Sequence, residues 1–310
     1  MNAFQLRAMT PADRHEVADL IYASINTWYR LRGLPQIFHG GSGVTEVFFD
    51  VYHGLEPGSG VVAENSRTGR LMGSCFYHVR PQHVALGIMN VHPNYFGEGV
   101  GRALLSYITD LADQRALPVR LTQSALNLDS FSLYNKAGFV PRGAYQDMTL
   151  AVPAEGFAPA DVGPSPFVRD ATVADIPAMT ELERSISGVT REIDYRYCIE
   201  NALGFWHVSV FESAPGRIDG FLASSRHAAV NMLGPGVCRT DEQAIALIRR
   251  ELDVNRGRSP VVLVPVERAA IVRQLYAWGA RNCELHFCQV RGEFQPFAGV
   301  NFPTFILETA

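Results

Sequence analysis

An apolar run, a glycine-rich loop and an amphipathic stretch follow one another at residues 84–111, and they constrain the fold more than any other part of the chain. The run at 84–91 predicts a strand, and apolar residues at helical spacing over 103–111 predict a helix. The loop between them contains Gly97, Gly99 and Gly101. Such a loop can present backbone N–H groups to an anion at the helix N-terminus, where the helix dipole also favours negative charge. The alternative is a tight turn without a ligand.

A second motif lies further along the chain, where Asn127 precedes the run Leu-Tyr-Asn-Lys-Ala-Gly-Phe at 133–139. Together the two segments resemble the GNAT superfamily of N-acetyltransferases. The family pattern is a strand ending in Val-x-Pro, a loop Arg/Gln-x-x-Gly-x-Gly/Ala, then an Asn, a Tyr near a helix end and Gly-Phe opening a strand. The matching positions are Val91, Pro93, Phe96, Gly99, Gly101, Asn127, Tyr134, Gly138 and Phe139.

The resemblance implies a cofactor of the acetyl-CoA type, with CoA as product and the pyrophosphate bound by the amides of residues 97–102. The cofactor-binding residues implied in this way are Met89, Asn90, Val91, Phe96, Gly97, Glu98, Gly99, Val100, Gly101, Arg102, Asn127 and Tyr134. Phe96 stands where the family usually has Arg or Gln. Because backbone amides supply most of the contacts, we expect weakened rather than lost binding.

Acetyl transfer to an amine requires a group that takes the amine's proton, a donor for the developing oxyanion and a source of a proton for the leaving thiolate. The resemblance implies that Tyr134 is the catalytic general acid, with its hydroxyl near the thioester sulfur; the alternative is an aromatic core residue. Asn127 either binds the pantetheine arm or caps a helix. A backbone N–H of Met89 or Asn90 is the candidate donor to the thioester carbonyl.

The general base is harder to assign, because many family members carry a Glu on the strand that here spans 84–91, and residues 85–90 contain no carboxylate. The remaining candidates are His78, His83, Glu46 and Asp50, or a chain of waters. The acceptor region is strongly aromatic, with Trp28, Tyr29, Phe38, His39, Phe48, Phe49 and Tyr52. These residues either recognise an amine with an apolar body or pack the core. The turn at 30–33 is a candidate for binding a carboxylate.

A faint internal repeat indicates two related halves. The segment at 168–175 matches 6–13, each reading as a strand followed by a Thr-x-x-Asp helix start, and 275–280 echoes 133–139. A proline- and glycine-rich stretch at 151–166 separates the halves. The chain resembles a tandem GNAT protein of α/β (α+β) class. Each domain should have a mixed, mostly antiparallel central sheet flanked by helices.

The expected domains are 1–150, which binds acetyl-CoA, the linker 151–166, and a degenerate GNAT-like domain at 167–310. The loop at 234–241 takes the place of the pyrophosphate loop in the second copy, but Pro235 removes a backbone donor. Thr240 or Asp241 is expected to cap the helix that follows. In the first domain the expected helices cover 11–29, 44–54 and 99–115 with another from 129, and the expected strands cover 4–9, 60–65, 70–79, 83–91, 118–123 and 139–150.

Composition excludes several classes of function. The chain has 310 residues, a formal net charge of −4 and no block of like charges, so a nucleic-acid or membrane partner has little support. The five cysteines show no metal-ligand spacing, and no metal is expected. The first residues do not read as a signal peptide, and we expect a cytoplasmic protein. The oligomeric state, including a homodimer, is left open.

The sequence therefore favours an N-acetyltransferase that moves an acetyl group from acetyl-CoA to a primary amine of a small molecule or peptide. The alternative is a non-catalytic acyl-CoA-binding or sensing module, in which the missing base is a real loss. A scaffold using both halves as interaction surfaces is the third reading.

Overall fold

The computed structural model describes residues 3–307, which form two compact units. Unit 1 contains the chain up to Val79, His83–Val119 and Phe305–Leu307. Unit 2 contains Arg80–Gln82 and Arg120–Thr304. The packing therefore divides the chain between Val119 and Arg120, whereas the sequence suggested a division at the linker 151–166.

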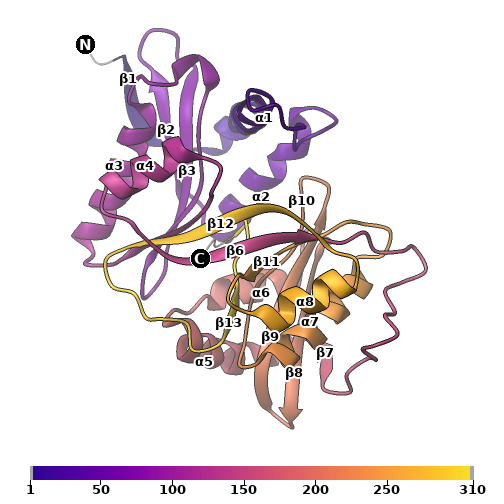
Figure 1. Cartoon of the computed structure of the whole chain (residues 1–310). Helices are drawn as coiled ribbons and strands as arrows, with labels where there is room; N and C mark the ends of the chain where they lie inside the picture. Colours follow the sequence, from indigo (N-terminus) through magenta and orange to yellow (C-terminus); the bar gives the residue numbers. More distant parts are fainter. Residues whose placement is uncertain (1–2, 308–310) are drawn as a thin grey trace. The chain divides into compact units, whose positions relative to one another are not determined.

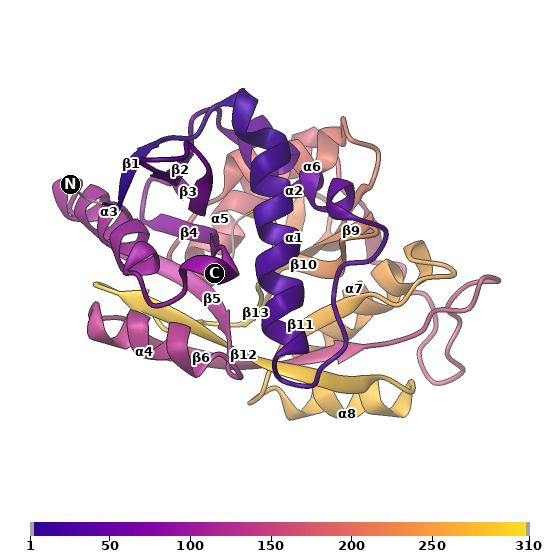
Figure 2. The ribbon, with the colours of Figure 1, turned by 90° about the horizontal axis from the view of Figure 1, so that it is seen from above.

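Unit 1 is built on four antiparallel strands in the order β1-β2-β3-β4. They are β1 (Phe4–Ala8), β2 (Gly60–Asn65), β3 (Leu71–Val79) and β4 (Val84–Val91). The helices are α1 (Arg14–Arg30), α2 (Glu46–Leu55) and α3 (Val100–Gln114), with short 3-10 turns η1 (Pro11–Asp13), η2 (Ser42–Thr45) and η3 (Pro93–Tyr95). In the view of Figure 2, α3 lies on one side of these strands and α1 and α2 lie on the other.

Two glycines let the helices of unit 1 approach the sheet closely. A β-carbon at Gly73 would lie 2.8 Å from Val100 Cγ1 of α3. One at Gly87 would lie 2.7 Å from the Tyr52 ring of α2. The apolar positions of α3 that predicted a helix are buried, including Leu104, Leu105 and Ile108. Burial of this stripe places the N-terminus of α3 next to the end of β4.

Unit 2 has strands in the order β7-β8-β9-β10-β11-β6-β12-β5, and β13 pairs with β10. Most pairs are antiparallel, and β10 with β11 is parallel. The strands are β5 (Val119–Ser124), β6 (Val140–Thr149), β7 (Val168–Asp170), β8 (Trp206–Ala214), β9 (Arg217–His227), β10 (Val230–Cys238), β11 (Val261–Pro265), β12 (Arg281–Arg291) and β13 (Val300–Phe302). The helices are α4 (Leu128–Lys136), α5 (Ile176–Ser187), α6 (Glu192–Glu200), α7 (Asp241–Val254) and α8 (Ala269–Ala277), with the 3-10 turn η4 (Val173–Asp175).

The last long strands of the two halves are exchanged. Strand β6 of the first half pairs with β11 of the second, whereas β12 of the second half lies between β6 and β5 of the first. Figure 1 shows β6 and β12 side by side. This exchange explains why residues 120–150 pack within unit 2 although the sequence repeat assigns them to the first half. Within residues 139–150, where the sequence predicted strands, the chain forms the one continuous strand β6.

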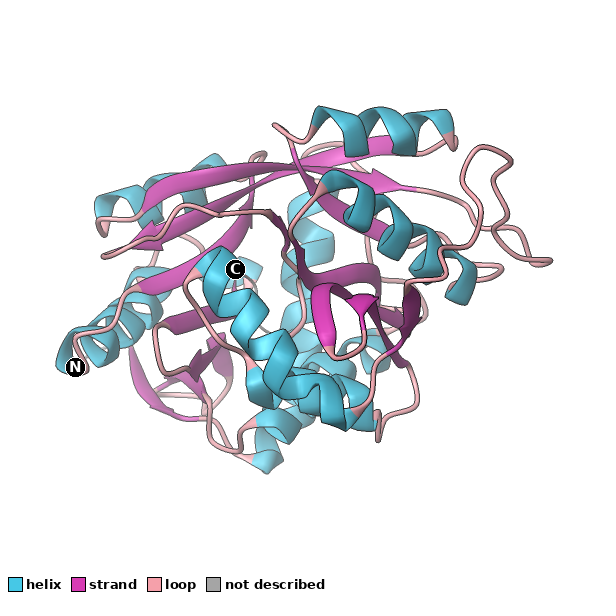
Figure 3. Cartoon of the chain, turned by 90° about the horizontal axis from the view of Figure 1, so that it is seen from below, coloured by secondary structure: helices cyan, strands magenta, loops and turns pink. Residues whose placement is uncertain are grey.

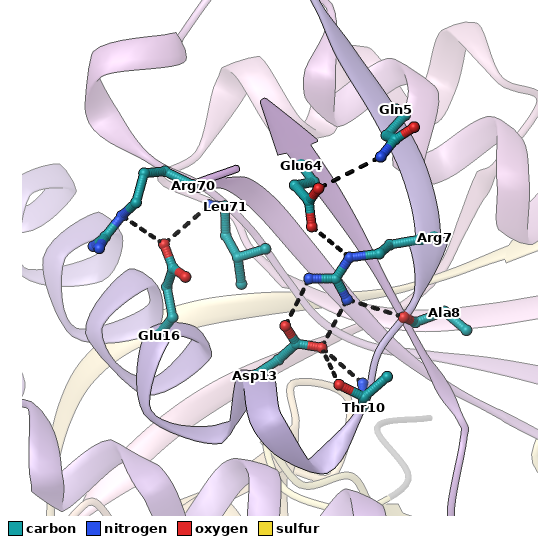
Figure 4. Close-up of polar contacts among 9 residues, drawn as sticks. All are labelled: Gln5, Arg7, Ala8, Thr10, Asp13, Glu16, Glu64, Arg70 and Leu71. Carbon is teal, nitrogen blue, oxygen red and sulfur yellow. Dashed lines mark hydrogen bonds and ion pairs between the residues drawn. The ribbon is translucent and has the colours of Figure 1, made fainter. Parts of the chain in front are cut away.

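The repeat seen in the sequence is matched by a repeated ion-pair network. In the first half, Arg7 binds Asp13 through Nη2 at 2.7 Å and Glu64 through Nε at 2.6 Å (Figure 4). In the second half, Arg169 binds Asp175 and Glu212 at 2.7 and 2.6 Å in the same way. Both predicted capping boxes are formed, at Thr10 and Thr172. The hydrogen bonds from Arg169 lower the pKa of Asp175 to about 2.

The segment at 151–166 contains no helix or strand, as its prolines predicted (Figure 3, loops in pink). It is nevertheless packed against unit 2. Val152 and Phe157 are buried, and Phe157 makes an edge contact with the Trp278 ring at 5.3 Å. The Phe157 N–H also donates to Asp253 at 2.9 Å. The segment is therefore fixed by burial and is not a free tether.

A buried glutamate of α7 joins this helix to two strands of unit 2, β8 and β9. Glu251 accepts hydrogen bonds from Ser209 Oγ at 2.5 Å, Ser224 Oγ at 2.6 Å and His207 Nδ1 at 2.9 Å. The other nitrogen of His207 lies 3.2 Å from Asp170 of β7. Burial on its own would lower the pKa of His207, but the hydrogen bond and negative charge of Glu251 outweigh it and raise this pKa.

We expect this histidine to make stability depend on pH. A raised pKa means that the stabilisation is fully present below the unfolded value of about 6.5 and is lost as pH rises through the folded value. As pH rises above about 6.5, urea midpoints of the wild type should therefore fall more steeply than those of His207→Gln, which keeps a donor to Glu251 but cannot gain a proton. Equal slopes in the two proteins would contradict this role.

Candidate functional site

The end of β4 carries an irregularity at the place where the sequence predicted thioester contacts. Met89 pairs with Cys75 of β3 and Leu86 pairs with Tyr77, so Gly87 and Ile88 face Phe76 alone. This is a β-bulge, which leaves backbone groups outside the regular ladder and re-aims the following side chains. Met89 and Val91 are half-buried and Asn90 is buried, with its side chain held at 2.8 Å by Ser24 Oγ of α1.

The loop from β4 into α3 has the geometry of an anion-binding turn. Gly97 and Gly99 have φ angles of +81° and +84°, a region that glycine adopts without strain. A β-carbon added at either glycine would have no neighbouring atom of the described residues within 4 Å, so the space over the loop is open. Gly99 is the N-cap residue of α3, and among the described residues no side chain caps this end.

The first amides of α3 have no partners within the helix, as at every helix N-terminus. The first turn contains no Asp or Glu, so the positive end of the dipole is not compensated by its own side chains. Phe96, Glu98 and Arg102 are exposed beside these amides. The structure thus brings together in unit 1 all ten predicted cofactor residues from Met89 to Arg102.

The other two predicted residues, Asn127 and Tyr134, lie in unit 2. Asn127 follows β5 and is the N-cap of α4, where its Oδ1 accepts from the Ser130 N–H at 3.1 Å. The capping interpretation is confirmed, and the pantetheine contact stays a prediction. Tyr134 is 6% exposed near the end of α4, and its ring centroid lies 5.7 Å from that of Phe139.

The second half differs at the corresponding position. Gly234–Cys238 lies inside β10 and is not a loop, which corrects the sequence interpretation, because these residues pair with both β9 and β13. Gly234 and Pro235 face Ala223 alone, so β10 has a bulge like that of β4. After this bulge, β13 pairs with residues 236–238, the counterparts of 89–91. Strand β13 therefore already pairs with the backbone of β10 that follows the second bulge.

The connection from β10 into α7 is also short, covering residues 239–240 where the first half has 92–99. Thr240 caps α7, accepting from the Gln243 N–H at 3.4 Å, with Gln243 closing a capping box. Side chains therefore satisfy helix amides that a phosphate would otherwise bind. Capping by Thr240 was one of the two predicted options and is confirmed.

The candidate bases named from the sequence are poorly placed to accept a proton. His78 and His83 are fully buried. Arg14 already binds Glu46 at 2.5 Å and Asp50 at 2.6 Å. Both carboxylates are therefore engaged in ion pairs with one guanidinium.

The aromatic acceptor region divides into two parts. Phe38, Phe48, Phe49 and Tyr52 are buried in the core of unit 1. The remaining members are half-buried or exposed, namely Trp28, Tyr29 and His39. The Arg32 guanidinium lies 4.0 Å from the centre of the Trp28 ring. The core interpretation therefore holds for four of the seven side chains.

One polar cluster of unit 2 was not predicted. His286 Nδ1 of β12 lies 2.9 and 3.0 Å from the two carboxylate oxygens of Asp147 of β6, and both side chains are buried. Glu284 joins them, and one N or O atom of each residue lies within 4.8 Å of the others. The two partners are 139 positions apart in sequence, and no spacing motif connects them. Only the pairing of β6 with β12 reveals the cluster.

No helix within residues 3–307 is long and apolar enough to cross a membrane.

Comparison with known proteins agrees with this geometry. Residues 25–139 match the profile of the acetyltransferase (GNAT) family. A stretch of 73 residues is 32% identical to the UPF0157 protein YqkA of Bacillus subtilis. That match covers 24% of this chain and 21% of the relative, so the chain spans about a fifth of that protein.

Solved structures resemble nearly the whole chain. A candidate acetyltransferase from Pyrococcus horikoshii has a TM-score of 0.74 at 14% identity, covering 97% of this chain and 95% of that one. A GCN5-related N-acetyltransferase from Sphaerobacter thermophilus gives 0.63 at 18%, covering 100% and 99%. A tandem GNAT protein from the clavulanic acid biosynthesis pathway gives 0.57 at 13%, covering 93% and 98%. At these identities the likeness establishes the fold, and the predicted fold class is confirmed.

Proposed function

We propose that this chain, which carries a GNAT acetyltransferase domain within a tandem GNAT fold, transfers an acetyl group from acetyl-CoA to a primary amine of a small molecule or peptide. One observation carries the proposal. The N-terminus of α3 presents amides behind an open loop of positive-φ glycines, directly after the bulged end of β4. This is an arrangement that suits a pyrophosphate followed by an extended arm.

The roles of the residues follow from this arrangement. The amides of residues 97–102 would bind the pyrophosphate, and a backbone N–H near Met89 would donate to the thioester carbonyl as negative charge develops there. Tyr134 would protonate the departing thiolate. Exposed Phe96 offers no hydrogen bond to phosphate, so binding depends on the backbone.

The proposal is tested by incubating the full chain with acetyl-CoA and a panel of polyamines, aromatic amines and short peptides. Free CoA thiol and the mass of the acetylated amine are followed together. We expect product with at least one amine, and none from a Gly99→Glu variant under the same conditions. Binding of acetyl-CoA without transfer to any amine would favour the non-catalytic sensing module instead.

We also expect one molecule of acetyl-CoA per chain. In the second half, β13 pairs with β10 after its bulge and Thr240 caps α7, so the backbone groups that would hold a second cofactor are already bonded. Isothermal titration calorimetry of the wild type should saturate at about one equivalent of acetyl-CoA, because we expect the uncapped loop before α3 to bind the pyrophosphate and the capped start of α7 not to. Saturation at two equivalents would show that the second half also binds.

A further inference from the structure

The face of the unit 1 sheet that α1 covers carries buried polar side chains with unused hydrogen-bonding atoms. We propose that Asn90 and Ser74 bind a carbonyl oxygen of the acceptor, one carbon away from the amine that is acetylated. Such an oxygen belongs to the amide at a peptide N-terminus or to the carboxylate of an amino acid. This inference rests on the proposed function and names the substrate class of the same site.

Strand pairing places the two side chains next to each other under α1. Ser74 of β3 pairs directly with Asn90 of β4, and directly opposite residues of an antiparallel pair share one face. A β-carbon at the preceding Gly73 would meet Val100 of α3, so Ser74 faces away from α3. Figure 2 shows α1 on that other side of the strands. In agreement, Ser24 Oγ of α1 donates to Asn90 Oδ1 at 2.8 Å.

Three polar atoms of this region are buried without a partner. Asn90 is 7% exposed and Ser74 is 0% exposed. Within residues 3–307, neither the Asn90 Nδ2 nor the Ser74 Oγ has a hydrogen-bond partner. Trp28 lies one turn after Ser24 on α1, and its buried Nε1 also has no partner in that range. An unpaired buried donor costs stability, so we expect the acceptor to displace the side chains that cover these atoms and to supply the missing partner.

The second half shows that these positions do not require polar side chains. Phe221 and Val237 pair directly in the ladder after the bulge of β10, and they are the counterparts of Ser74 and Asn90. Both are fully buried and apolar. Ile186 of α5, likewise fully buried, takes the place of the α1 serine that contacts the asparagine. The half with the open glycine loop therefore keeps polar side chains where the other half packs apolar ones.

The unused atoms define the chemistry of the ligand. Asn90 Nδ2 and Trp28 Nε1 can only donate, and the Ser74 hydroxyl can donate as well. A carbonyl oxygen only accepts, and it has two lone pairs. Asn90 directly follows Met89, whose N–H is a candidate donor to the thioester carbonyl, so this oxygen should lie only a few bonds from the attacking amine. An α-amino carbonyl compound meets this requirement.

The test compares three acceptors of the same branched shape in the full-length protein. Glycinamide carries an amide oxygen, glycine carries a carboxylate and isobutylamine has no carbonyl oxygen. We expect the wild type to prefer glycinamide or glycine to isobutylamine, and the better of the two identifies the source of the oxygen. In Asn90→Val, the ratio of kcat/KM for that acceptor to kcat/KM for isobutylamine should fall by about 10-fold. Ser74→Ala should change the ratio in the same direction.

The melting temperature separates this role from a structural one. Asn90→Val introduces the side chain found in the second half and removes an unpaired donor, while Ser24 keeps its hydrogen bond to Ile21 O at 3.2 Å. The melting temperature should therefore equal or exceed that of the wild type. The control is Thr45→Val, which removes a buried hydroxyl that already donates to Ala18 O at 2.8 Å. It should lower the melting temperature and leave the ratio unchanged.

A wild type that prefers isobutylamine, or an unchanged ratio in both Asn90→Val and Ser74→Ala, would overturn this subsite and leave the acetyltransferase function standing. A fall of the ratio that follows the loss of melting temperature, and occurs in Thr45→Val as well, would also overturn it. So would a wild type that acetylates other amines of the panel but none of these three. A wild type that acetylates no amine would overturn the proposed function and the subsite together.

Discussion

A Gly99→Glu variant should lose acetyl-CoA binding while remaining folded. Gly99 has a φ of +84° and caps α3, and the space above it is open. A carboxylate at this position would bind the first amides of the helix and repel the pyrophosphate. Hydrogen bonds to charged groups contribute about 1.5–3 kcal/mol each, so losing two of them raises Kd by about 10²-fold or more.

Two further variants separate charge from backbone strain. Gly99→Ala adds only the cost of a β-carbon at positive φ, about 1–2 kcal/mol, and should weaken binding far less than Glu. Gly40→Glu places the same charge at the same φ of +84°, also in open space, but outside the α3 loop. It should bind acetyl-CoA normally. Unchanged calorimetric affinity in a folded Gly99→Glu variant would remove this loop from the site.

Tyr134→Phe should slow acetyl transfer by about 10²-fold with little change in acetyl-CoA binding, because the hydroxyl matters mainly as the thiolate leaves. The ring itself is retained, and with it the contact with Phe139. Turnover and melting temperature should be measured on the same preparation. If CoA thiolate departs unaided, Tyr134 is a packing residue.

The internal repeat provides a matched control for this variant. Tyr276 occupies the position in α8 that corresponds to Tyr134 in α4, and its hydroxyl donates to Gln146 at 3.2 Å. Tyr276→Phe removes the same hydroxyl from the half that lacks an open loop, and its turnover should equal that of the wild type. Full turnover with a lowered melting temperature in Tyr134→Phe would exclude this tyrosine from the mechanism.

Local patterns predicted the elements of the first half closely. The expected helix at 99–115 is α3 (Val100–Gln114), and the expected strand at 83–91 is β4. Hydrophobic periodicity and glycine positions act over a few residues, so they report the type and the ends of an element. They do not report which strand lies beside it, and the partner of β6 was therefore not predictable from these patterns.

The same limit explains what was missed in the site. The glycine loop and the Tyr-x-x-x-Gly-Phe motif are continuous in sequence and were found, although cofactor contacts by Asn127 and Tyr134 stay predictions. The Asp147–His286 pair exists only because β6 and β12 are neighbours. The loss of the second loop was inferred from Pro235. Strand β13 was not expected, because Val300–Phe302 is too short to show a period.

The strand exchange has a consequence for how the protein is made. The ribosome synthesises residues 1–150 long before it reaches β12. Until then, the strand that lies between β5 and β6 in the folded protein does not exist. The nascent first half therefore carries two unsatisfied strand edges through most of translation. It can complete its fold only after β12 (Arg281–Arg291) has also been synthesised, so the two halves must fold together.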